Sequence, residues 1–382
     1  MKIPLFKIYW DKNDIAAVGS TIRKGYGWAC GSEIENFEKA ISKYMGVKYC
    51  ATFNSGTSAL HALLLAYGIG PSDEVIVPSF TFIATANAAL FVGAKPVFAD
   101  IEDKTFGLDP SDVERKITER TKAIIAVHYA GCPCKIEELR KIADAHKIVL
   151  IEDAAEAMGA KVNGKMVGTI GHAAVLSFCQ NKIITTGEGG AVITNDTSIY
   201  EKLHLIEKLK FIRSHGREEG EYFSSAENLD YVALGYNFRM SSITAALGVA
   251  QLKKITKVLS MRQKVAEYYK NRLSKINGLI IPEVPTNSTH AYQIFTIRIK
   301  GGRQKRDELI AYLAKNGISS KVYFEPVHLT RFYREKFGYR GGELPVTERI
   351  SGEVMSLPMY PVLTKQEIDH VVGKTSEFFG RN

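Results

Sequence analysis

Along the first half of the chain, short apolar runs alternate with stretches in which apolar residues recur every three or four positions. Residues 33–45 are an example of the second kind, with Ile34, Phe37 and Ile41 on one side and Gly46 directly after them. This spacing predicts a helix that buries one face, and glycine is the residue that helix C-caps favour. Further stretches that predict helices lie at 59–67, 82–92 and 136–146.

The runs between these helices are continuously apolar rather than alternating. They lie at 49–53, 75–77, 96–99, 122–127, 148–151, 173–178 and 191–194. Continuous apolar strands are buried on both faces, and strands that alternate with helices belong to parallel sheets. The pattern therefore predicts an α/β fold with a mostly parallel sheet that has helices on both of its faces.

The pattern changes after Gly235. One helical stretch covers 241–273, and we expect a break in it near Leu259. Beyond it the sequence predicts a strand at 292–299, a helix at 306–316, a strand at 318–324 and a final helix at 366–379. We therefore expect two domains, a large α/β domain at 1–250 and a smaller α+β domain at 251–382.

Composition and charge limit the partners of the chain. Its 382 residues are 45% hydrophobic and 24% charged, which is ordinary for a globular protein. The formal net charge of +9 fits a lysine-rich surface and also the attraction of anionic ligands. The basic residues are spread out, and no motif that reads DNA or RNA accompanies them, so we expect no nucleic-acid partner.

The cysteines and the lengths of the apolar runs indicate in which cellular compartment we expect the protein. The five cysteines are an odd number without framework spacing, which argues against a disulfide scaffold. Cys132 and Cys134 form a C-x-C pair, but no second pair or histidine cluster at ligand spacing follows, so we expect no metal. We find no signal peptide and no apolar run of membrane-spanning length. We therefore expect reduced thiols, no membrane partner and a cytoplasmic location.

The first chemical signal is the run NSGTS at 54–58, between a predicted strand and a predicted helix. Backbone N–H groups at a helix N-terminus, with Gly56 and small hydroxyl residues beside them, form an anion site. The alternative is a simple helix cap made by Ser55 or Thr57. This run alone does not decide between the two interpretations.

Two further signals follow at strand ends. Asp153 lies at the C-terminal end of a buried strand, where open α/β sheets place their ligands. A buried carboxylate is costly unless a cation meets it, although a helix N-cap is the alternative role. Lys182 lies between an apolar strand and the glycine-rich turn at 187–190. A neutral lysine held there can act as a nucleophile, whereas the alternative is a solvated surface lysine.

The order of the three signals is more specific than any one of them. A phosphate cradle comes first, then the strand-end Asp153, and then Lys182, 29 residues later. A fold-type I enzyme dependent on pyridoxal 5′-phosphate (PLP) needs a phosphate anchor, a partner for the pyridine nitrogen and a Schiff-base lysine. The sequence therefore predicts a PLP site.

At this point the chain resembles the DegT/DnrJ/EryC1/StrS family of sugar aminotransferases along nearly its whole length. The matching segments are GWACG at 27–31, NSGTSAL at 54–60, VPSFTFIAT at 77–85, EDAAE at 152–156, SFCQNKIITTGEGG at 177–190, GYNFRM at 235–240, AALGVAQ at 245–251 and LPMYP at 357–361. The resemblance implies a fold-type I PLP transferase, with a mostly parallel seven-stranded sheet in the large domain.

The resemblance also assigns roles around the cofactor ring. Lys182 would form the Schiff base with PLP, and Asp153 would pair with the pyridine nitrogen. Phe82 would lie over the ring face, although without the family it reads equally as a core phenylalanine. Glu156 departs from the family, which often has glutamine near the phenolic oxygen. An acid there should be protonated, bridged or turned away, because two like charges repel.

Other residues would hold the cofactor phosphate. The resemblance places Ser55, Gly56, Thr57 and Ser177 around it within one subunit. Asn237 would reach the phosphate of the neighbouring subunit's cofactor, so the family implies a homodimer with shared active sites. Without the family, Asn237 reads as a turn residue.

The implied reaction has two halves. Glutamate, the usual donor in the family, would leave its amino group on the cofactor, and a nucleotide-linked keto-sugar would then take it up in ping-pong fashion. The segments at 181–190 and 234–239 look more like the branch that aminates C4 of a 4-keto-6-deoxy sugar. Amination of C3, amination of a cyclitol ketone and a regulatory protein on the same fold are the alternatives. The sequence leaves the nucleotide open.

Overall fold

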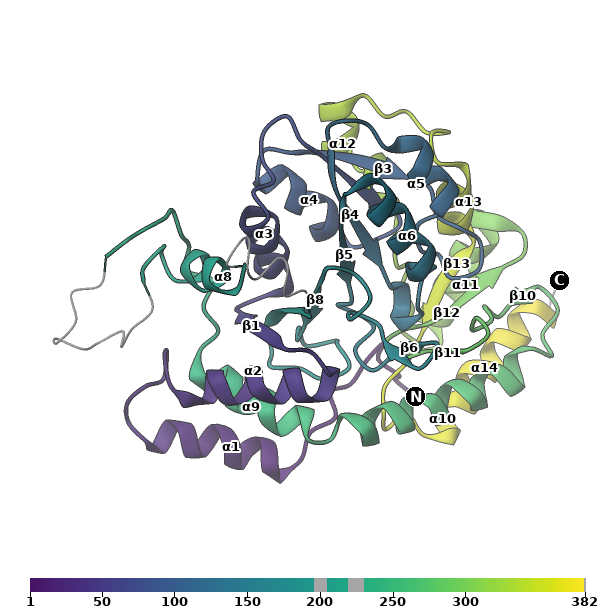
Figure 1. The fold of residues 1–382 in the computed structure, drawn as a ribbon. Coiled ribbons are helices and arrows are strands. Elements are labelled where there is room, and N and C mark those ends of the chain that lie inside the picture. Colours follow the sequence, from purple (N-terminus) through teal and green to yellow (C-terminus); the bar gives the residue numbers. More distant parts are fainter. Residues whose placement is uncertain (196–204, 219–229, 381–382) are drawn as a thin grey trace.

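The computed structural model describes residues 1–195, 205–218 and 230–380. Its centre is a seven-stranded sheet in the order β1-β9-β8-β5-β4-β2-β3 (Figure 1). The strands are β1 Tyr49–Phe53, β2 Glu74–Pro78, β3 Lys95–Ala99, β4 Thr121–Val127, β5 Val149–Asp153, β8 Ala173–Ser177 and β9 Gly190–Thr194. Only β9 runs antiparallel to its neighbours, β1 and β8, and this arrangement confirms the predicted mostly parallel sheet.

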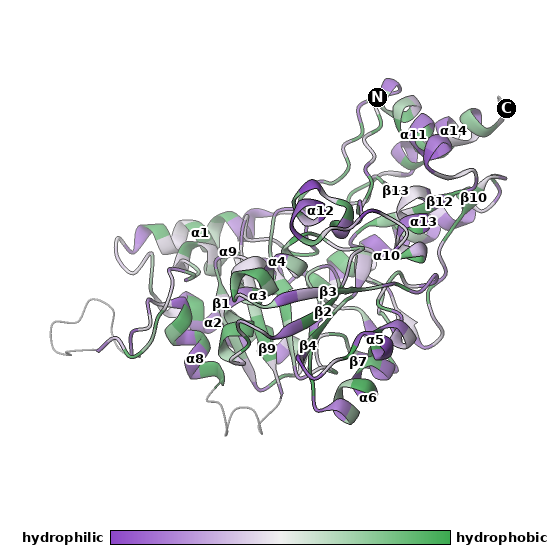
Figure 2. Ribbon diagram, turned by 90° about the horizontal axis from the view of Figure 1, so that it is seen from above, coloured by the Kyte–Doolittle hydropathy of each residue, from purple (hydrophilic) through white to green (hydrophobic). Residues whose placement is uncertain are grey.

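Helices cover both faces of this sheet because alternate residues of each strand point to opposite sides. On β5, Ile151 joins the core that contains helices α3 and α4, whereas Leu150 joins the core that contains α6. The helices of the large sheet are α3 Gly56–Ala66, α4 Ala84–Phe91, α5 Pro110–Lys116, α6 Ile136–His146 and α8 Leu205–Arg213. Figure 2 shows hydrophilic and hydrophobic colours side by side on α6 and α8, as expected for helices that bury one face.

A second group of helices packs where the sheet carries β1 and β9. It consists of α1 Lys12–Arg23, α2 Ser32–Met45 and α9 Ser242–Leu252, and α9 contacts both of the others. Phe37 of α2 fits against Gly248 of α9, where a Cβ atom would lie 2.5 Å from its ring. Gly46 ends α2 in the left-handed conformation, with φ of 70°, as the sequence predicted.

The C-terminal part forms its own three-stranded antiparallel sheet, in the order β10-β12-β13. Its elements are β10 Leu279–Ile280, β12 Phe295–Ile299, β13 Val354–Leu357, α10 Ile255–Leu273, α11 Gly302–Lys315, α13 Pro345–Glu353 and α14 Lys365–Gly380. The core between this sheet and its helices also contains Ile3 from the start of the chain. The domain boundary near residue 250 stays a prediction, and that position falls inside α9.

Short elements complete the described chain. They are β6 Lys161–Val162, β7 Lys165–Met166, β11 Ser288–Thr289, the 3₁₀ turns η1 Tyr129–Gly131 and η2 Val327–Leu329, and α12 Arg331–Phe337. Among the described helices, none combines the length and the apolar character needed to cross a membrane.

Three sequence predictions about the C-terminal part were wrong. The segment 318–324 is not a strand, because it makes only single bridges, from Ile318 to Ile3 and from Lys321 to Ser356. Ile318 is buried and the apolar side chains at 322–324 are partly buried by packing against other segments, so the segment has the same apolar pattern as a paired strand. The break in the long helical stretch lies between α9 and α10, at residues 253–254, and not near Leu259. Lys254 leaves the helix pattern there and pairs with Asp14 at 2.5 Å.

The strand expected at 292–299 begins only at residue 295, because Tyr292 adopts a positive φ of 50° that interrupts an extended strand.

Candidate active site

A cleft of about 420 Å³ opens where the C-terminal ends of the parallel strands meet the C-terminal part of the chain. Its lining includes almost every residue that the sequence predicted to surround the cofactor, together with further residues, of which four matter for the arguments below. The predicted ones are Ser55, Gly56, Thr57, Phe82, Asp153, Glu156, Ser177 and Lys182, and the others are Thr85, Lys321, Tyr323 and Phe324.

One end of the cleft is the N-terminus of α3. Ser55 is the N-cap of this helix, and its hydroxyl accepts a hydrogen bond from the backbone N–H of Ser58 at 3.0 Å. The first N–H groups of a helix have no partner within the helix, so those of Gly56 and Thr57 are available to an anion. A Cβ atom on Gly56 would lie only 3.2 Å from the Cβ of Ser177, so a larger residue would crowd this end. Ser55 is therefore the helix cap of one sequence interpretation, and the anion site of the other stays a prediction that the free N–H groups allow.

The floor of the cleft carries the carboxylate of Asp153. The side chain is 7% exposed, and its Oδ2 accepts a hydrogen bond from the hydroxyl of Thr85 at 2.8 Å. Its Oδ1 accepts from the backbone N–H of Ala155 at 3.2 Å, and no helix follows, so Asp153 is not an N-cap. Both of these partners are neutral. A buried carboxylate with neutral partners fits a cationic ligand group such as a protonated pyridine nitrogen.

Thr85 is a site residue that sequence reasoning missed. Its hydroxyl also lies 2.9 Å from that of Thr81, one helical turn earlier, and both side chains are buried. A possible signal was present, because Thr81 and Thr85 are the polar residues of the otherwise apolar segment 80–85. Their spacing places them on one side of a helical turn, but only the fold shows that this side faces Asp153.

Lys182 and Glu156 form an ion pair inside the cleft. The Nζ of Lys182 lies 3.5 Å from Oε1 of Glu156, and the Lys182 side chain is only 14% exposed. The other carboxylate oxygen of Glu156 accepts a hydrogen bond from the backbone N–H of Ala130 at 2.8 Å. In the structure this acid is therefore paired with Lys182, and its arrangement beside the phenolic oxygen of the cofactor stays a prediction. Lys182 is not the solvated surface lysine of the alternative interpretation.

Aromatic side chains form the wall opposite the sheet. Phe82 is 58% exposed, so it is not a core residue, and its ring centroid lies 6.2 Å from that of Phe324. Tyr323 lies next to Phe324, and its carbonyl accepts a hydrogen bond from the buried hydroxyl of Tyr129. Burial raises the pKa of the Tyr323 hydroxyl and the carboxylate of Glu156 raises it further, so Tyr323 is uncharged at neutral pH.

Asn237 is the one predicted site residue that does not line this cleft. Its side chain is exposed, and its backbone carbonyl accepts a hydrogen bond from the side-chain amide of Asn54 at 3.2 Å. Asn54 directly precedes the N-cap of α3. Asn237 therefore lies near the predicted phosphate end of the cleft but faces outward, toward the surrounding solvent or another chain.

Directly behind the floor of the cleft lies a buried pair, His128 and Glu152. The imidazole Nε2 of His128 lies 2.9 Å from Oε2 of Glu152, and both side chains are 0% exposed. Nδ1 of His128 accepts from the backbone N–H of Cys134, so the proton belongs on Nε2, which donates to Glu152. Glu152 also accepts backbone N–H groups of Gly168, Ile170 and Gly171. This network fixes the loop at 168–171 against the end of β5. It thereby also fixes the position of the neighbouring Asp153.

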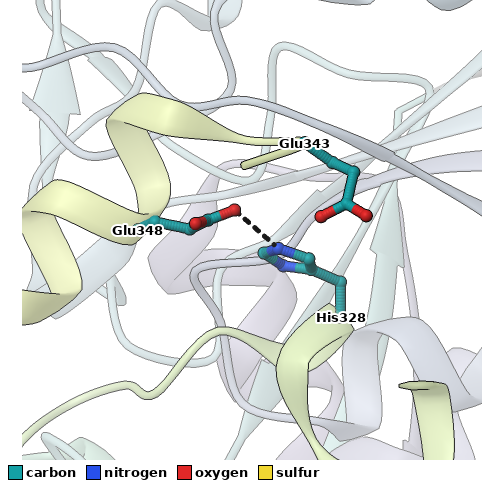
Figure 3. A group of neighbouring side chains, drawn as sticks. All are labelled: His328, Glu343 and Glu348. Carbon is teal, nitrogen blue, oxygen red and sulfur yellow. Dashed lines mark hydrogen bonds and ion pairs between the residues drawn. The ribbon is translucent and has the colours of Figure 1, made fainter. Parts of the chain in front are cut away.

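A second cluster of ionisable side chains, His328, Glu343 and Glu348, lies away from the cleft (Figure 3). The buried His328 contacts Ser79 through Nδ1 at 2.6 Å and Glu348 through Nε2 at 3.2 Å. The two carboxylates accept backbone N–H groups from residues 340–344. These hydrogen bonds explain why the three side chains lie together, because they hold the loop at 338–344 against η2.

The comparisons with known proteins decide the family. Residues 9–376 match the model of the DegT/DnrJ/EryC1/StrS aminotransferase family. The chain belongs to this family. It is 39% identical to the GDP-perosamine synthase of Caulobacter vibrioides, over 90% of this chain and 89% of that protein. It is 33% identical to the UDP-4-amino-4-deoxy-L-arabinose–oxoglutarate aminotransferase of Shewanella sediminis, over 99% of this chain and 98% of that protein.

A solved structure extends the likeness to the fold. DesV of S. venezuelae, determined in complex with a ketimine intermediate, superposes with a TM-score of 0.89 at 31% identity, covering 100% of this chain and 99% of that one. The protein is therefore a PLP-dependent aminotransferase of fold type I. The cleft fits this cofactor, because it offers the open end of α3 to a phosphate, the buried Asp153 to a pyridinium and Lys182 to an aldehyde.

Proposed function

We propose that this aminotransferase moves an amino group from glutamate to C4 of a nucleotide-linked 4-keto-6-deoxy sugar. The observation that carries the proposal is the convergence of Lys182, Asp153 and the N-terminus of α3 on one cleft. The substrate class is supported by the relatives, whose names are those of enzymes that form GDP-perosamine or act on a UDP-linked aminosugar.

The residues of the cleft would hold the cofactor at three points. The N–H groups of Gly56 and Thr57, together with the hydroxyls of Ser55 and Ser177, would bind its phosphate. Phe82 would cover one face of the ring. Asp153, fixed by Thr85, would hold a proton at the pyridine nitrogen.

When bound, PLP supplies an electron-withdrawing ring that stabilises negative charge on the carbon that loses a proton. The amine of Lys182 would take this proton from Cα of glutamate and deliver it to the cofactor carbon C4′. Glu156 lies beside Lys182 and would orient the amine between these two atoms. The same groups would work in the reverse order on the keto-sugar, so ping-pong kinetics are expected.

Amination at C4 is supported by two observations. The segments at 181–190 and 234–239 resemble the C4-aminating branch of the family. The Shewanella relative carries a 4-amino-4-deoxy sugar and oxoglutarate in its name, which also supports glutamate as the donor.

We also propose that the protein works as a homodimer with shared sites. Large apolar side chains are exposed near the N-terminal helices and beside Asn237, namely Trp10, Ile15, Tyr26, Trp28, Tyr231, Val232 and Leu234. Exposed apolar groups in such numbers indicate a protein interface. Asn237 follows three of them along the chain, which supports the proposal that its side chain reaches a partner's cofactor. A measurement of mass in solution tests the dimer, and an active monomer would exclude it.

The function is tested by a panel of nucleotide-linked sugars with the ketone at C3 or C4, each incubated with glutamate and PLP. Mass spectrometry of the products should show an added amino group only on 4-keto sugars, with 2-oxoglutarate formed in equal amount. Amination at C3 alone would overturn the positional assignment. No amination of any nucleotide-linked sugar, with turnover of a cyclitol ketone, would overturn the substrate class.

A further inference from the structure

Among the residues that the structure describes, the cleft contains one cation that the proposed mechanism does not use. Its charged lining residues are Asp153, Glu156, Lys182, Glu188 and Lys321. Lys182 pairs with Glu156, and the carboxylate of Glu188 contacts the thiol of Cys179 at 3.5 Å. For Lys321, the described residues place no carboxylate within 4.0 Å of the ammonium, and its recorded side-chain contact is with the ring of Tyr323. A positive charge in a substrate cleft without an acidic partner is available to an anionic ligand.

The position of Lys321 is fixed by its backbone. Its N–H donates to the carbonyl of Ser356 at 3.2 Å, and its carbonyl accepts from the N–H of Ser356 at 2.8 Å. The ammonium lies 5.1 Å from the centre of the Tyr323 ring, and Tyr323 is itself held by Tyr129. A cation over an aromatic face keeps its remaining donors for other partners. The side chain is therefore presented to the cleft from a segment whose backbone is hydrogen-bonded to β13.

We propose that Lys321 binds the diphosphate of the nucleotide-linked sugar and so selects for nucleotide-linked acceptors. This inference rests on the function proposed above. In a hexopyranose, C1 carries the diphosphate and C4 lies across the ring from it. When C4 faces Lys182, which is 14% exposed, the diphosphate must point away from it, toward the mouth of the cleft. Lys321 is exposed at that mouth.

The other anions of the reaction fit other places. The cofactor phosphate is accounted for by the N-terminus of α3. The α-carboxylate of glutamate is bonded directly to the reacting carbon, so it must lie deep in the cleft near Lys182. Only the diphosphate needs a cation one sugar ring away from the reacting atoms. Lys321 is the cleft residue that meets this need.

The experiment separates the two half-reactions in the full-length holoenzyme. Lys321→Ala, Lys321→Arg and the control Lys300→Ala are compared with the wild type, because Lys300 is an exposed lysine directly after β12 that does not line the cleft. The glutamate half-reaction is followed alone, as the change in cofactor absorbance, and KM is then measured for the nucleotide-linked sugar. Binding of GDP, UDP and dTDP is measured by calorimetry, independently of turnover.

For Lys321→Ala we expect KM for the sugar nucleotide to rise about 10-fold, because a charge-assisted hydrogen bond is lost. The glutamate half-reaction should stay within about 2-fold of the wild type, Lys321→Arg should keep most of the affinity, and Lys300→Ala should change nothing. The tightest-binding nucleoside diphosphate should bind about 10-fold more weakly to Lys321→Ala.

Three results would overturn the inference. They are an unchanged KM in Lys321→Ala, an equal loss in the glutamate half-reaction, which would assign Lys321 to the donor carboxylate, and no binding of any nucleoside diphosphate by the wild type. Failure of the proposed function is a different result, in which the wild type aminates no nucleotide-linked sugar. The calorimetric comparison then still decides whether Lys321 binds a diphosphate.

Discussion

The carboxylate of Glu156 lies 3.5 Å from the ammonium of Lys182, and its second oxygen is held by the backbone N–H of Ala130. Glu156 is therefore held by one charged partner and by one backbone N–H group. The charge of Glu156 is fixed in place from both sides. The carboxylate therefore interacts directly with the charge on the nitrogen of Lys182.

The first prediction concerns this charge. In the PLP-loaded enzyme, a nearby carboxylate favours the protonated form of the lysine–cofactor chromophore. Glu156→Gln should therefore lower the midpoint of the pH-dependent absorbance change, by about 1 pH unit. Glu188→Gln is the matched control, because Glu188 lines the same cleft but contacts Cys179. An equal midpoint in Glu156→Gln and wild type would contradict the prediction.

The second prediction concerns Lys182 itself. Lys182→Ala removes the amine that moves the proton, and turnover should fall by at least about 10³-fold. The melting temperature should stay within about 5 °C of the wild type, because Glu156 keeps its hydrogen bond to Ala130. Turnover is measured as 2-oxoglutarate formed, and folding by circular dichroism. Activity comparable to the wild type would remove Lys182 from the mechanism.

Thr85 provides the third prediction, because its hydroxyl is the side-chain partner of Asp153 at 2.8 Å. Thr85→Val keeps the volume and removes the hydrogen bond, so Asp153 is less well fixed toward the cofactor. The Kd for PLP should rise about 10-fold, as expected for a buried hydrogen bond to a charged group. Thr85→Ser should bind PLP nearly as well as the wild type. Fluorescence titration of the apoenzyme measures both, and equal affinities of the valine and serine variants would refute the role.

The fourth prediction concerns stability and pH. Burial by itself would raise the pKa of Glu152, but the hydrogen bonds from His128 and from the N–H groups of Gly171 and Gly168 outweigh it, so the pKa is lowered. A carboxyl group with a lowered pKa in the folded state stabilises the protein above its ordinary pKa of 4.5 and loses this contribution as the pH falls through the folded-state value.

Glu152→Gln should therefore cost about 3 kcal/mol of unfolding free energy at pH 7, because it leaves the buried partners of a charged group incompletely satisfied. The difference from the wild type should shrink as the pH falls below 4.5. Urea unfolding at several pH values measures it, and Glu119→Gln, an exposed acid, is the control. A cost that does not change with pH would show that the charge of Glu152 does not stabilise the fold.

Local sequence patterns predicted most of the strands and helices of the fold and many of the residues that line the cleft. The apolar runs predicted the seven strands of the large sheet, because a buried strand must be apolar whatever it pairs with. The same patterns were ambiguous at 318–324, where apolar side chains are buried or partly buried without strand pairing. Periodicity reports burial, and it does not report which hydrogen bonds the backbone makes.

The sequence by itself determined the order of the chemical groups: a helix N-terminus at Gly56, a strand-end acid at Asp153 and a lysine before a glycine turn. Each depends on its near neighbours along the chain. Only the tertiary structure decided that Thr85 donates to Asp153, that Glu156 pairs with Lys182 and that Lys321 enters the same cleft. These contacts join residues 68, 26 and more than 100 positions apart. Such distances are closed by the packing of the whole sheet against its helices, which no local pattern encodes.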